Sequence, residues 1–183
     1  AVTILGYSLY MVFNSWMPTY ITRRFGVSLA ESGAFVALFP AVGILARPAG
    51  GWLSDTVCAQ RRRPVFAASF VGATVLAAVM FYSTTIAVLV ALLVLAGVFI
   101  QLQIGLMYQS IQEFVDPRAA GTAVSLASVA GWLGSFVAPV LAGELITAAG
   151  TAAVLFVLAI GLGVAGTVVV WQMAESGEPP APA

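Results

Sequence analysis

The sequence predicts an all-α membrane protein with six transmembrane helices. Of its 183 residues, 61% are hydrophobic and only 8% are charged, whereas about a quarter of a typical soluble domain is charged. Six apolar segments are separated by short polar, Pro- or Gly-containing stretches. Each has about twenty residues, the helix length that crosses a bilayer core of roughly 30 Å. A chain of this composition could not cover a water-facing surface.

The elements are expected to be helices because backbone hydrogen bonds in lipid must be closed within the segment, and the alternation of a transmembrane strand is missing. Local signals mark several ends: a Ser28/Glu31 capping box, Pro64 and Asp116-Pro117 at starts, and Gly26 and Gly150 at ends. The expected spans are about 1–22, 29–53, 64–82, 86–109, 119–145 and 152–172.

The charged residues outside the spans predict the orientation in the membrane. Arg61–Arg63 and Arg118 fall in loops on one side, and Arg23 and Arg24 fall on the other. Short cytoplasmic loops are enriched in basic residues, so the former side is expected to be cytoplasmic, with both termini there, in a multi-pass plasma-membrane protein. The polar, Pro-rich residues 173–183 predict a disordered cytoplasmic tail.

The first residues suggest that the sequence starts at a domain boundary. It begins inside an apolar run, without the basic region and small-residue cleavage site of a signal peptide.

Several function classes are excluded by residues that the chain lacks. It has no His and one cysteine, Cys58, so we expect no metal site, no cofactor and no disulfide. No set of nucleophile, base and orienting group can be assembled, so we expect no catalytic residues and no enzyme activity. Without Lys or a basic stripe, nucleic-acid binding is not expected either.

Arg47 is the residue that most needs an explanation, because it places a charge inside the second apolar segment. Burying a guanidinium in hydrocarbon costs from about 3 to more than 10 kcal/mol, so such residues usually line an ion or substrate path. Its planar fork can bind a flat oxyanion through two parallel hydrogen bonds. Alternatively, the side chain snorkels roughly 9 Å to the lipid phosphates. The narrow surface of Pro48, Gly50 and Gly51 favours a face turned to protein.

Other polar residues lie at a similar depth. Tyr7 and either Gln101 or Gln103 fall, like Arg47, a few residues to the cytoplasmic side of the middle of their spans. Together with Asn14 on the first span, they are candidates for a cavity that binds a small anion. Tyr and Gln in membrane helices also commonly join helices by hydrogen bonds, and this alternative stays open.

The polar residues repeat after three spans. Spans three and six carry almost nothing polar beyond Ser and Thr, which suits lipid-facing helices, whereas spans one, two, four and five carry the unusual residues. This pattern predicts a three-plus-three repeat bundle of the kind found in secondary transporters. The fifth span has a row of small residues that predicts close helix packing, static or sliding: Gly121, Gly131 and Gly134, followed by Pro139.

The loop after the second span combines opposite charges. Gly51 and Asp55 end the span, and Arg61, Arg62 and Arg63 follow after a short connection. These charges either set the topology alone or form a gate latch that parts in one conformation. No acidic residue falls near the middle of a span, so we expect exchange, or coupling housed elsewhere, rather than a proton relay here.

The same stretch, Gly51-x-x-x-Asp55 followed by Arg61-Arg62-Arg63-Pro64, resembles the loop motif of the major facilitator superfamily. In that family the motif lies between helices two and three and again between helices eight and nine. Six spans with the motif after the second resemble its C-terminal six-helix half, which would cover residues 1–172 and implies an absent N-terminal half as partner.

A narrower resemblance concerns the anion. Gly43-Ile-Leu-Ala-Arg47-Pro-Ala-Gly50 is similar to helix eight of the nitrate/nitrite porters, where an Arg in this place clamps the anion with a partner Arg from the N-terminal half. Gly131-x-x-Gly134-x-Phe136-x-x-Pro139 is similar to their Gly-rich helix eleven. The porter site includes a Tyr on helix seven, which implies a role for Tyr7, with Tyr10 as the alternative.

The function expected from the residues and the resemblance is secondary transport of a small, nitrate- or nitrite-like anion by alternating access, coupled by exchange or through the absent half. The expected partners are the anionic substrate, the lipid bilayer and the N-terminal half. An organic-anion, carboxylate or other small-solute porter is the alternative within transport. In another class, the chain is a membrane scaffold or receptor that transports nothing.

Overall fold

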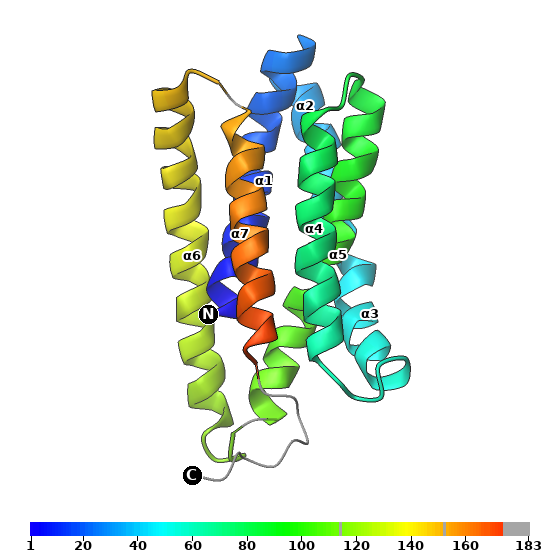
Figure 1. The fold of residues 1–183 in the computed structure, drawn as a ribbon, viewed down its shortest axis with the longest axis vertical. Coiled ribbons are helices and arrows are strands. Elements are labelled where there is room, and N and C mark those ends of the chain that lie inside the picture. The colour runs from blue at the N-terminus through cyan, green and yellow to red at the C-terminus, as the bar shows by residue number, and fades with distance from the viewer. Residues whose placement is uncertain (114, 152, 174–183) are drawn as a thin grey trace.

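The computed structural model describes residues 1–113, 115–151 and 153–173, and it is an all-helical bundle (Figure 1). The predicted fold class is thereby confirmed. The predicted disordered tail lies outside the described residues, apart from Met173. The elements are α1 (Val2–Phe25), α2 (Leu29–Ala41), α3 (Gly43–Thr56), α4 (Arg63–Phe81), α5 (Ile86–Glu113), α6 (Ala120–Ala149) and α7 (Val154–Trp171).

Within the described part of the chain, 5 helical segments are long and apolar enough to cross a membrane. One of them is α2 and α3 taken together, and the others are α4, α5, α6 and α7. The remaining helix, α1, has 24 residues and is less apolar because of its Tyr, Ser, Asn and Pro side chains. It packs against α6 and α7 as the sixth member of the bundle.

Local chemistry explains where the helices begin and end. Ser28 and Glu31 form the predicted capping box, in which the Glu31 carboxylate accepts from the Ser28 N–H at 2.9 Å and the Ser28 hydroxyl accepts from the Glu31 N–H at 3.2 Å. Gly26 and Gly150 close α1 and α6 with φ of 71° and 66°. This left-handed conformation is one that glycine adopts without strain.

The second span is broken at Val42, a feature that the sequence analysis missed by treating 29–53 as one helix. Pro40 and Pro48 lack the N–H groups that would otherwise bond back to the preceding turn, so the hydrogen-bond ladder is interrupted on both sides of Val42. Broken helices inside a membrane need other groups to satisfy the freed backbone carbonyls.

The contacts between helices repeat in the way that a three-plus-three bundle requires. In such a bundle, α1, α2 with α3, and α4 correspond in order to α5, α6 and α7. The α1–α6 contact therefore corresponds to the contact of α5 with α2 and α3. The same correspondence relates α1–α7 to α4–α5, α1–α2 to α5–α6, and α3–α4 to α6–α7. The remaining pairs between different spans, α4–α7 and α1–α5, are each their own counterpart, and the α2–α3 contact lies within one span.

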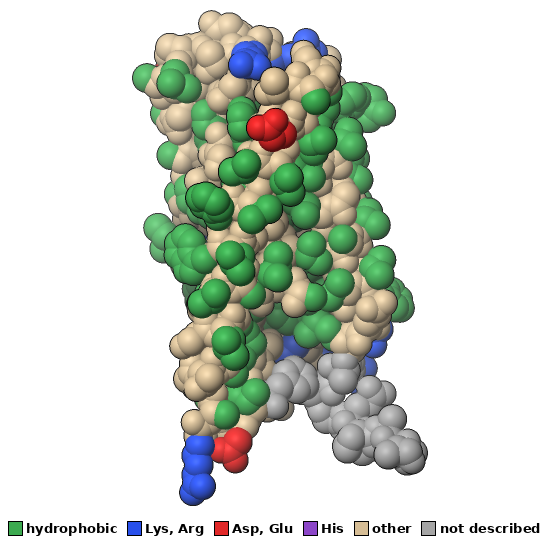
Figure 2. All heavy atoms as spheres, turned by 90° about the vertical axis from the view of Figure 1, so that its left-hand side faces the viewer, with side chains coloured by type: hydrophobic (Ala, Val, Ile, Leu, Met, Phe, Trp, Pro, Cys, Tyr) green, Lys and Arg blue, Asp and Glu red, His purple; other side chains and the backbone are tan. Residues whose placement is uncertain are grey.

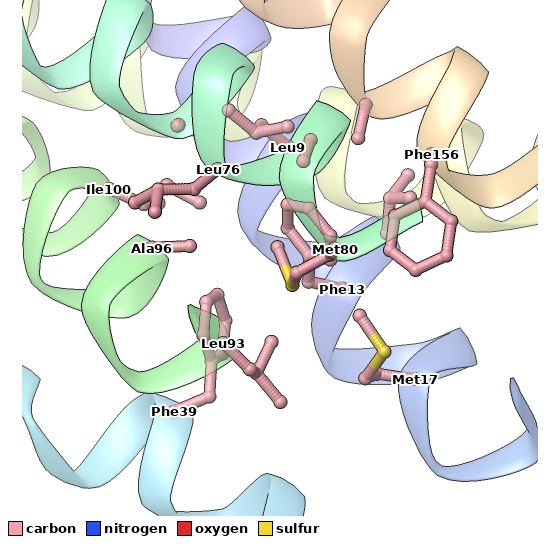
Figure 3. Close-up of a cluster of buried hydrophobic side chains, with 14 of the residues drawn as sticks. Leu9, Phe13, Met17, Phe39, Leu76, Met80, Leu93, Ala96, Ile100 and Phe156 are labelled. Carbon is pink, nitrogen blue, oxygen red and sulfur yellow. The ribbon is translucent and has the colours of Figure 1, made fainter. Parts of the chain in front are cut away.

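The buried core lies where α1, α2, α4, α5 and α7 meet (Figure 3). It contains large side chains from all five helices, including Phe13, Phe39, Met80, Leu93 and Phe156. Lipid tails are as apolar as these groups, so close packing rather than escape from the solvent holds such helices together.

The outer surface is apolar along most of its height. Figure 2 shows hydrophobic side chains spread over the face formed by α6, with basic side chains gathered at its two ends. The exposed side chains on α6 include Trp132, Phe136 and Val140. This distribution suits contact with lipid or with another helical unit.

The closest approach to the second span is made by α5, and glycines permit it. A Cβ atom on Gly50 would collide with the backbone carbonyl of Leu102, and a Cβ atom on Gly105 would collide with that of Arg47. The obstructing atoms are backbone, so a larger residue could be accommodated only if α3 and α5 moved apart.

We predict that Gly105→Ala lowers the free energy of unfolding by about 1–3 kcal/mol, because the added methyl group forces α3 and α5 apart. The control is Gly161→Ala in α7, where a Cβ atom meets nothing within 4 Å. That variant should be neutral or slightly more stable, since alanine favours a helix. Thermal unfolding of the purified protein in detergent measures both, and equal midpoints would contradict the predicted clash.

Candidate functional site

Arg47 lies on an exposed part of α3, and its head is held by α5. The Nε–H donates to the Oε1 atom of Gln101 at 2.9 Å. The side chain of Arg47 makes no other hydrogen bond to a described residue, so its two terminal nitrogens have no acceptor among them. The interaction fixes the orientation of the guanidinium while leaving most of its donors available.

Gln101 also explains how the broken second span is tolerated. Its Nε2 atom donates to the carbonyl oxygen of Pro40 at 3.3 Å, next to the break. Gln101 itself is fully buried, and Gly43 makes room for it because a Cβ atom there would overlap its amide group. One amide therefore satisfies a carbonyl at the break and positions Arg47.

Tyr7 on α1 lies within electrostatic reach of Arg47. Its hydroxyl group is 3.0 Å from that of Tyr108 on α5. The Tyr7 ring also lies beside that of Trp132 on α6, with centroids 6.5 Å apart. The structure thus brings Arg47, Gln101 and Tyr7 together, and it adds Tyr108 and Trp132.

The other predicted site residues lie elsewhere. Gln103 points away from Gln101, because residues two apart on a helix lie on nearly opposite faces, and it packs against Gly6 of α1. Both of its amide atoms are buried without a hydrogen-bond partner among the described residues. Asn14 is half-buried about two turns beyond Tyr7, and Tyr10 stacks on Phe39 at 5.3 Å.

Most of the predicted small residues of α6 pack against α1. A Cβ atom on Gly131 would come within 2.9 Å of the Tyr7 ring, and one on Gly134 within 2.6 Å of the Ile4 carbonyl. Gly121 differs, since a Cβ atom there would meet nothing within 4 Å.

Pro139, the last residue of that row, is held by a hydrogen bond from α1. Its carbonyl oxygen accepts from the Trp16 indole N–H at 2.8 Å. A Cβ atom on Gly143 would lie 2.8 Å from the Trp16 ring, so this glycine makes room for the indole. The α1–α6 contact therefore combines close packing with a polar anchor.

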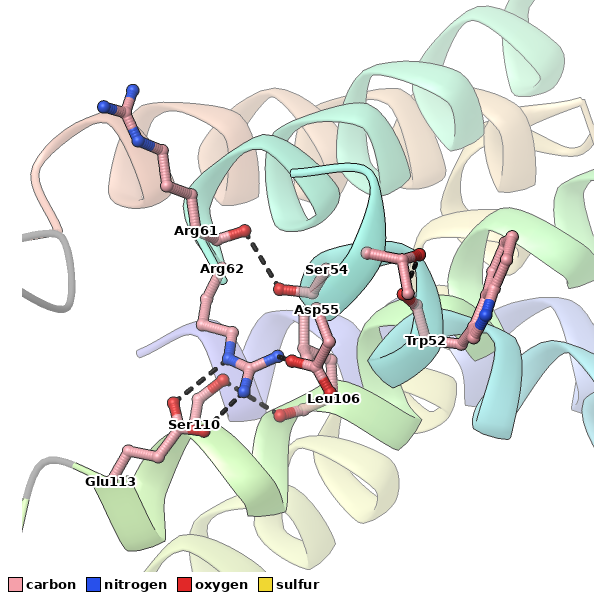
Figure 4. A network of polar contacts seen from close by, with 9 residues as sticks. Trp52, Ser54, Asp55, Arg61, Arg62, Leu106, Ser110 and Glu113 are labelled. Carbon is pink, nitrogen blue, oxygen red and sulfur yellow. Dashed lines mark hydrogen bonds and ion pairs between the residues drawn. The ribbon is translucent and has the colours of Figure 1, made fainter. Parts of the chain in front are cut away.

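A second cluster lies at the end of the bundle where α3, α4 and α5 meet (Figure 4). Arg62 is only 5% exposed, and its guanidinium donates to Asp55 at 2.6 Å and to Glu113 through Nε at 3.0 Å. A further ion pair joins Nη2 to the second oxygen of Glu113. Bonding to Glu113, and then to Asp55, raises the pKa of Arg62, so its charge is held firmly.

The neighbouring arginines, Arg61 and Arg63, make other contacts. Arg63 donates to the carbonyl of Trp171 at 2.7 Å and stacks on its ring, 5.3 Å from the centroid. The backbone carbonyl of Arg61 accepts from the Ser54 hydroxyl at 3.0 Å. Gly51 lies close to Gln109, since a Cβ atom on it would be 3.1 Å from the Gln109 Oε1 atom.

Sequence reasoning missed Tyr108, Trp132 and Glu113 as members of these clusters. A signal existed for Tyr108, which follows Gln101 by about two turns and therefore shares its helix face. Glu113 carried no such signal, because its partner Arg62 is distant in sequence and only the approach of α5 to the start of α4 brings the two together.

Comparison with known protein families decides the classification. The model of the Major Facilitator Superfamily matches residues 1–183. The chain belongs to this superfamily. It is therefore a multi-pass membrane protein of a transporter family, in agreement with its apolar helices.

Individual relatives of this superfamily chain share modest identity with it. It is 30% identical over 139 residues to the "Probable nitrate/nitrite transporter NarK2" of Mycobacterium tuberculosis, covering 73% of the chain and 33% of that protein. It is 27% identical over 169 residues to the "Nitrite extrusion protein" of Bacillus subtilis, covering 92% and 42%. The "MFS-type transporter ppzB" of Metarhizium majus is 28% identical over 180 residues, covering 94% and 39%.

The chain thus spans between 33% and 42% of the length of these three relatives.

We predict that the interaction between Arg62 and Glu113 stabilises the folded protein. Either Arg62→Gln or Glu113→Gln should destabilise the protein, and a double-mutant cycle in thermal or denaturant unfolding should give a coupling of roughly 1–3 kcal/mol. Asp116→Asn, in the exposed loop beyond α5, is the matched control: asparagine keeps the Oδ1 acceptor for the Arg118 N–H, so the midpoint should stay unchanged. Strictly additive effects of the two single changes would disprove the coupling.

Proposed function

We propose that the chain is the C-terminal six-helix half of a transporter that moves a small planar anion, nitrate or nitrite, by alternating access around Arg47. The observation that carries this proposal is the Arg47–Gln101 hydrogen bond of 2.9 Å. It orients a guanidinium on an exposed face of a membrane helix without neutralising its charge.

The chemistry of this arrangement favours an oxyanion. Gln101 occupies the Nε–H, so the terminal nitrogens of Arg47 remain for two parallel hydrogen bonds to a flat anion. The hydroxyl of Tyr7, which lies within electrostatic reach of Arg47 and is paired with that of Tyr108, would supply a further donor. The names of two relatives refer to nitrate or nitrite, which agrees with this class of ligand.

A second half is part of the proposal. The relatives are two to three times as long as the aligned part of this chain, which leaves room for an N-terminal six-helix unit. That unit would cover the exposed faces of α3 and α6 and bring a second arginine to the anion. The Arg62 cluster would lie in the cytoplasm with both termini and act as a latch between conformations.

Exchange is the proposed coupling mode. Among the described residues, the acidic side chains lie toward the ends of helices or in loops, so none supplies a carboxylate at the middle of the membrane: Glu31, Asp55, Glu113, Asp116 and Glu144.

An organic carboxylate is the second candidate substrate. An arginine fork binds a carboxylate with the same two parallel hydrogen bonds as nitrate. The chain also matches ppzB over 94% of its length, and that relative's name states no substrate. A scaffold or receptor without transport activity would instead show no uptake of either anion class.

We predict that Arg47→Lys lowers nitrate uptake by at least about tenfold, because an ammonium group keeps the charge but lacks the planar fork. The test is uptake into proteoliposomes containing the protein at its natural length. Arg118→Lys, in an exposed loop, serves as the matched control and should transport normally. Unchanged uptake by the Arg47 variant would exclude the clamp.

We also predict that Gln101→Glu abolishes anion binding; because the variant also loses the amide donor to the Pro40 carbonyl, its fold is checked by circular dichroism before binding is measured. The new carboxylate would lie about 3 Å from the guanidinium and neutralise it, which removes the attraction for an anion. Gln112→Glu, exposed on the last turn of α5, is the control of equal charge. Nitrate binding to the purified variants by calorimetry measures the effect, and an affinity equal to that of the parent protein would rule out this role of Gln101.

A further inference from the structure

A basic cavity lies at the end of the bundle opposite the Arg62 cluster. It has a volume of about 440 Å³. Its lining comes from the end of α1, the end of α4 and the region between α6 and α7: Tyr20, Arg23, Arg24, Phe81, Gly150, Thr151 and Ala153. Both arginines are exposed, and neither forms an ion pair with another described residue. The cavity therefore offers two positive charges to an anionic group.

An apolar groove begins where this cavity ends. It has a volume of about 220 Å³ and lies between α4 and α7, lined by Ala78, Phe81, Tyr82, Phe156, Val157 and Ile160. Phe81 lines both spaces, so the two are adjacent. From Phe156 to Ile160 the groove follows α7 about one turn, roughly 6 Å, toward the middle of the bundle.

Aromatic rings mark the boundary between the two spaces. Phe156 meets Tyr20 edge-on at 4.9 Å and Phe81 at 6.3 Å, and Phe81 meets Tyr82 at 5.1 Å. Tyrosines and tryptophans of membrane helices gather at the level of the lipid head groups. Tyr82, which is 78% exposed, is placed to lie at that level. The basic cavity then has the depth of head groups, and the groove has the depth of acyl chains.

We propose that this surface binds one anionic phospholipid from the leaflet on this side of the membrane. The phosphate lies between Arg23 and Arg24, and an acyl chain lies in the groove between α4 and α7. A charged cavity that continues into an apolar groove matches both parts of such a molecule. A free anion would use only the cavity.

The position of the arginines at the end of α1 also suits the dipole of that helix, but this does not explain the groove. The two spaces together join α1, α4 and α7. A lipid that fills both would contact all three helices, and a ligand that binds only the folded state raises its stability.

The experiment measures lipid binding to the protein at its natural length, purified in a neutral detergent. Native mass spectrometry and thermal unfolding are followed during titration with phosphatidylglycerol, phosphatidylcholine or glycerol 3-phosphate. We expect phosphatidylglycerol to bind and to raise the unfolding temperature, and the other two to do neither at matched concentration. Removing both charges in Arg23→Gln/Arg24→Gln should weaken phosphatidylglycerol binding roughly 30-fold.

A second variant tests the groove without touching the charges. Ala78→Leu fills the space between α4 and α7 and should also weaken binding, whereas Ala68→Leu, exposed on the same helix outside the groove, should not. Arg118→Gln at the other end of the bundle is the charge control.

Three results would overturn the proposal. Equal binding of phosphatidylcholine would show that the charge is not recognised, and equal stabilisation by glycerol 3-phosphate would indicate a site for free anions. Full phosphatidylglycerol binding by folded Ala78→Leu would place the lipid elsewhere. If the double arginine variant does not fold, as judged by circular dichroism, the Ala78→Leu and Ala68→Leu comparison decides alone.

Discussion

The close approach of α3 and α5 is the constraint on which the rest of the structure depends. Gly50 and Gly105 each lie against the backbone of the other helix, so the two helices are as near as their main chains allow. Both polar clusters span this contact: Arg47 on α3 meets Gln101 on α5 in one, and Asp55 and Glu113 share Arg62 in the other. A movement of α5 against α3 would change both clusters at once, which links the candidate anion site to the proposed latch.

The counterpart of this contact in the other half of the repeat, between α1 and α6, uses the same packing but different chemistry. Gly134 receives the Ile4 carbonyl much as Gly105 receives that of Arg47. There the polar contact is the neutral hydrogen bond from Trp16 to Pro139. The two halves of the repeat therefore share one backbone arrangement. Charged side chains lie at the α3–α5 contact, whereas the α1–α6 contact has a neutral hydrogen bond.

Much of the fold could be predicted because its causes are local. The Ser28 capping box, the left-handed glycines at 26 and 150, and the length of the apolar runs each depend on a few consecutive residues. The break at Val42 could have been predicted from Pro40 and Pro48, which flank it. The group that satisfies the backbone carbonyl at the break could not. Whether a freed carbonyl is satisfied depends on a side chain from another helix, here Gln101.

The sequence by itself determined that the chain is a bundle of membrane helices with an arginine in the second span. The length of an apolar segment and a charge inside it are properties of consecutive residues. Only the tertiary structure decided that Gln101 rather than Gln103 holds Arg47, and that Arg62 rather than its neighbours joins Asp55 to Glu113. Helix periodicity limits which residues share a face, but the rotation and approach of packed helices select the pairs that meet, and these depend on glycines far apart in the sequence.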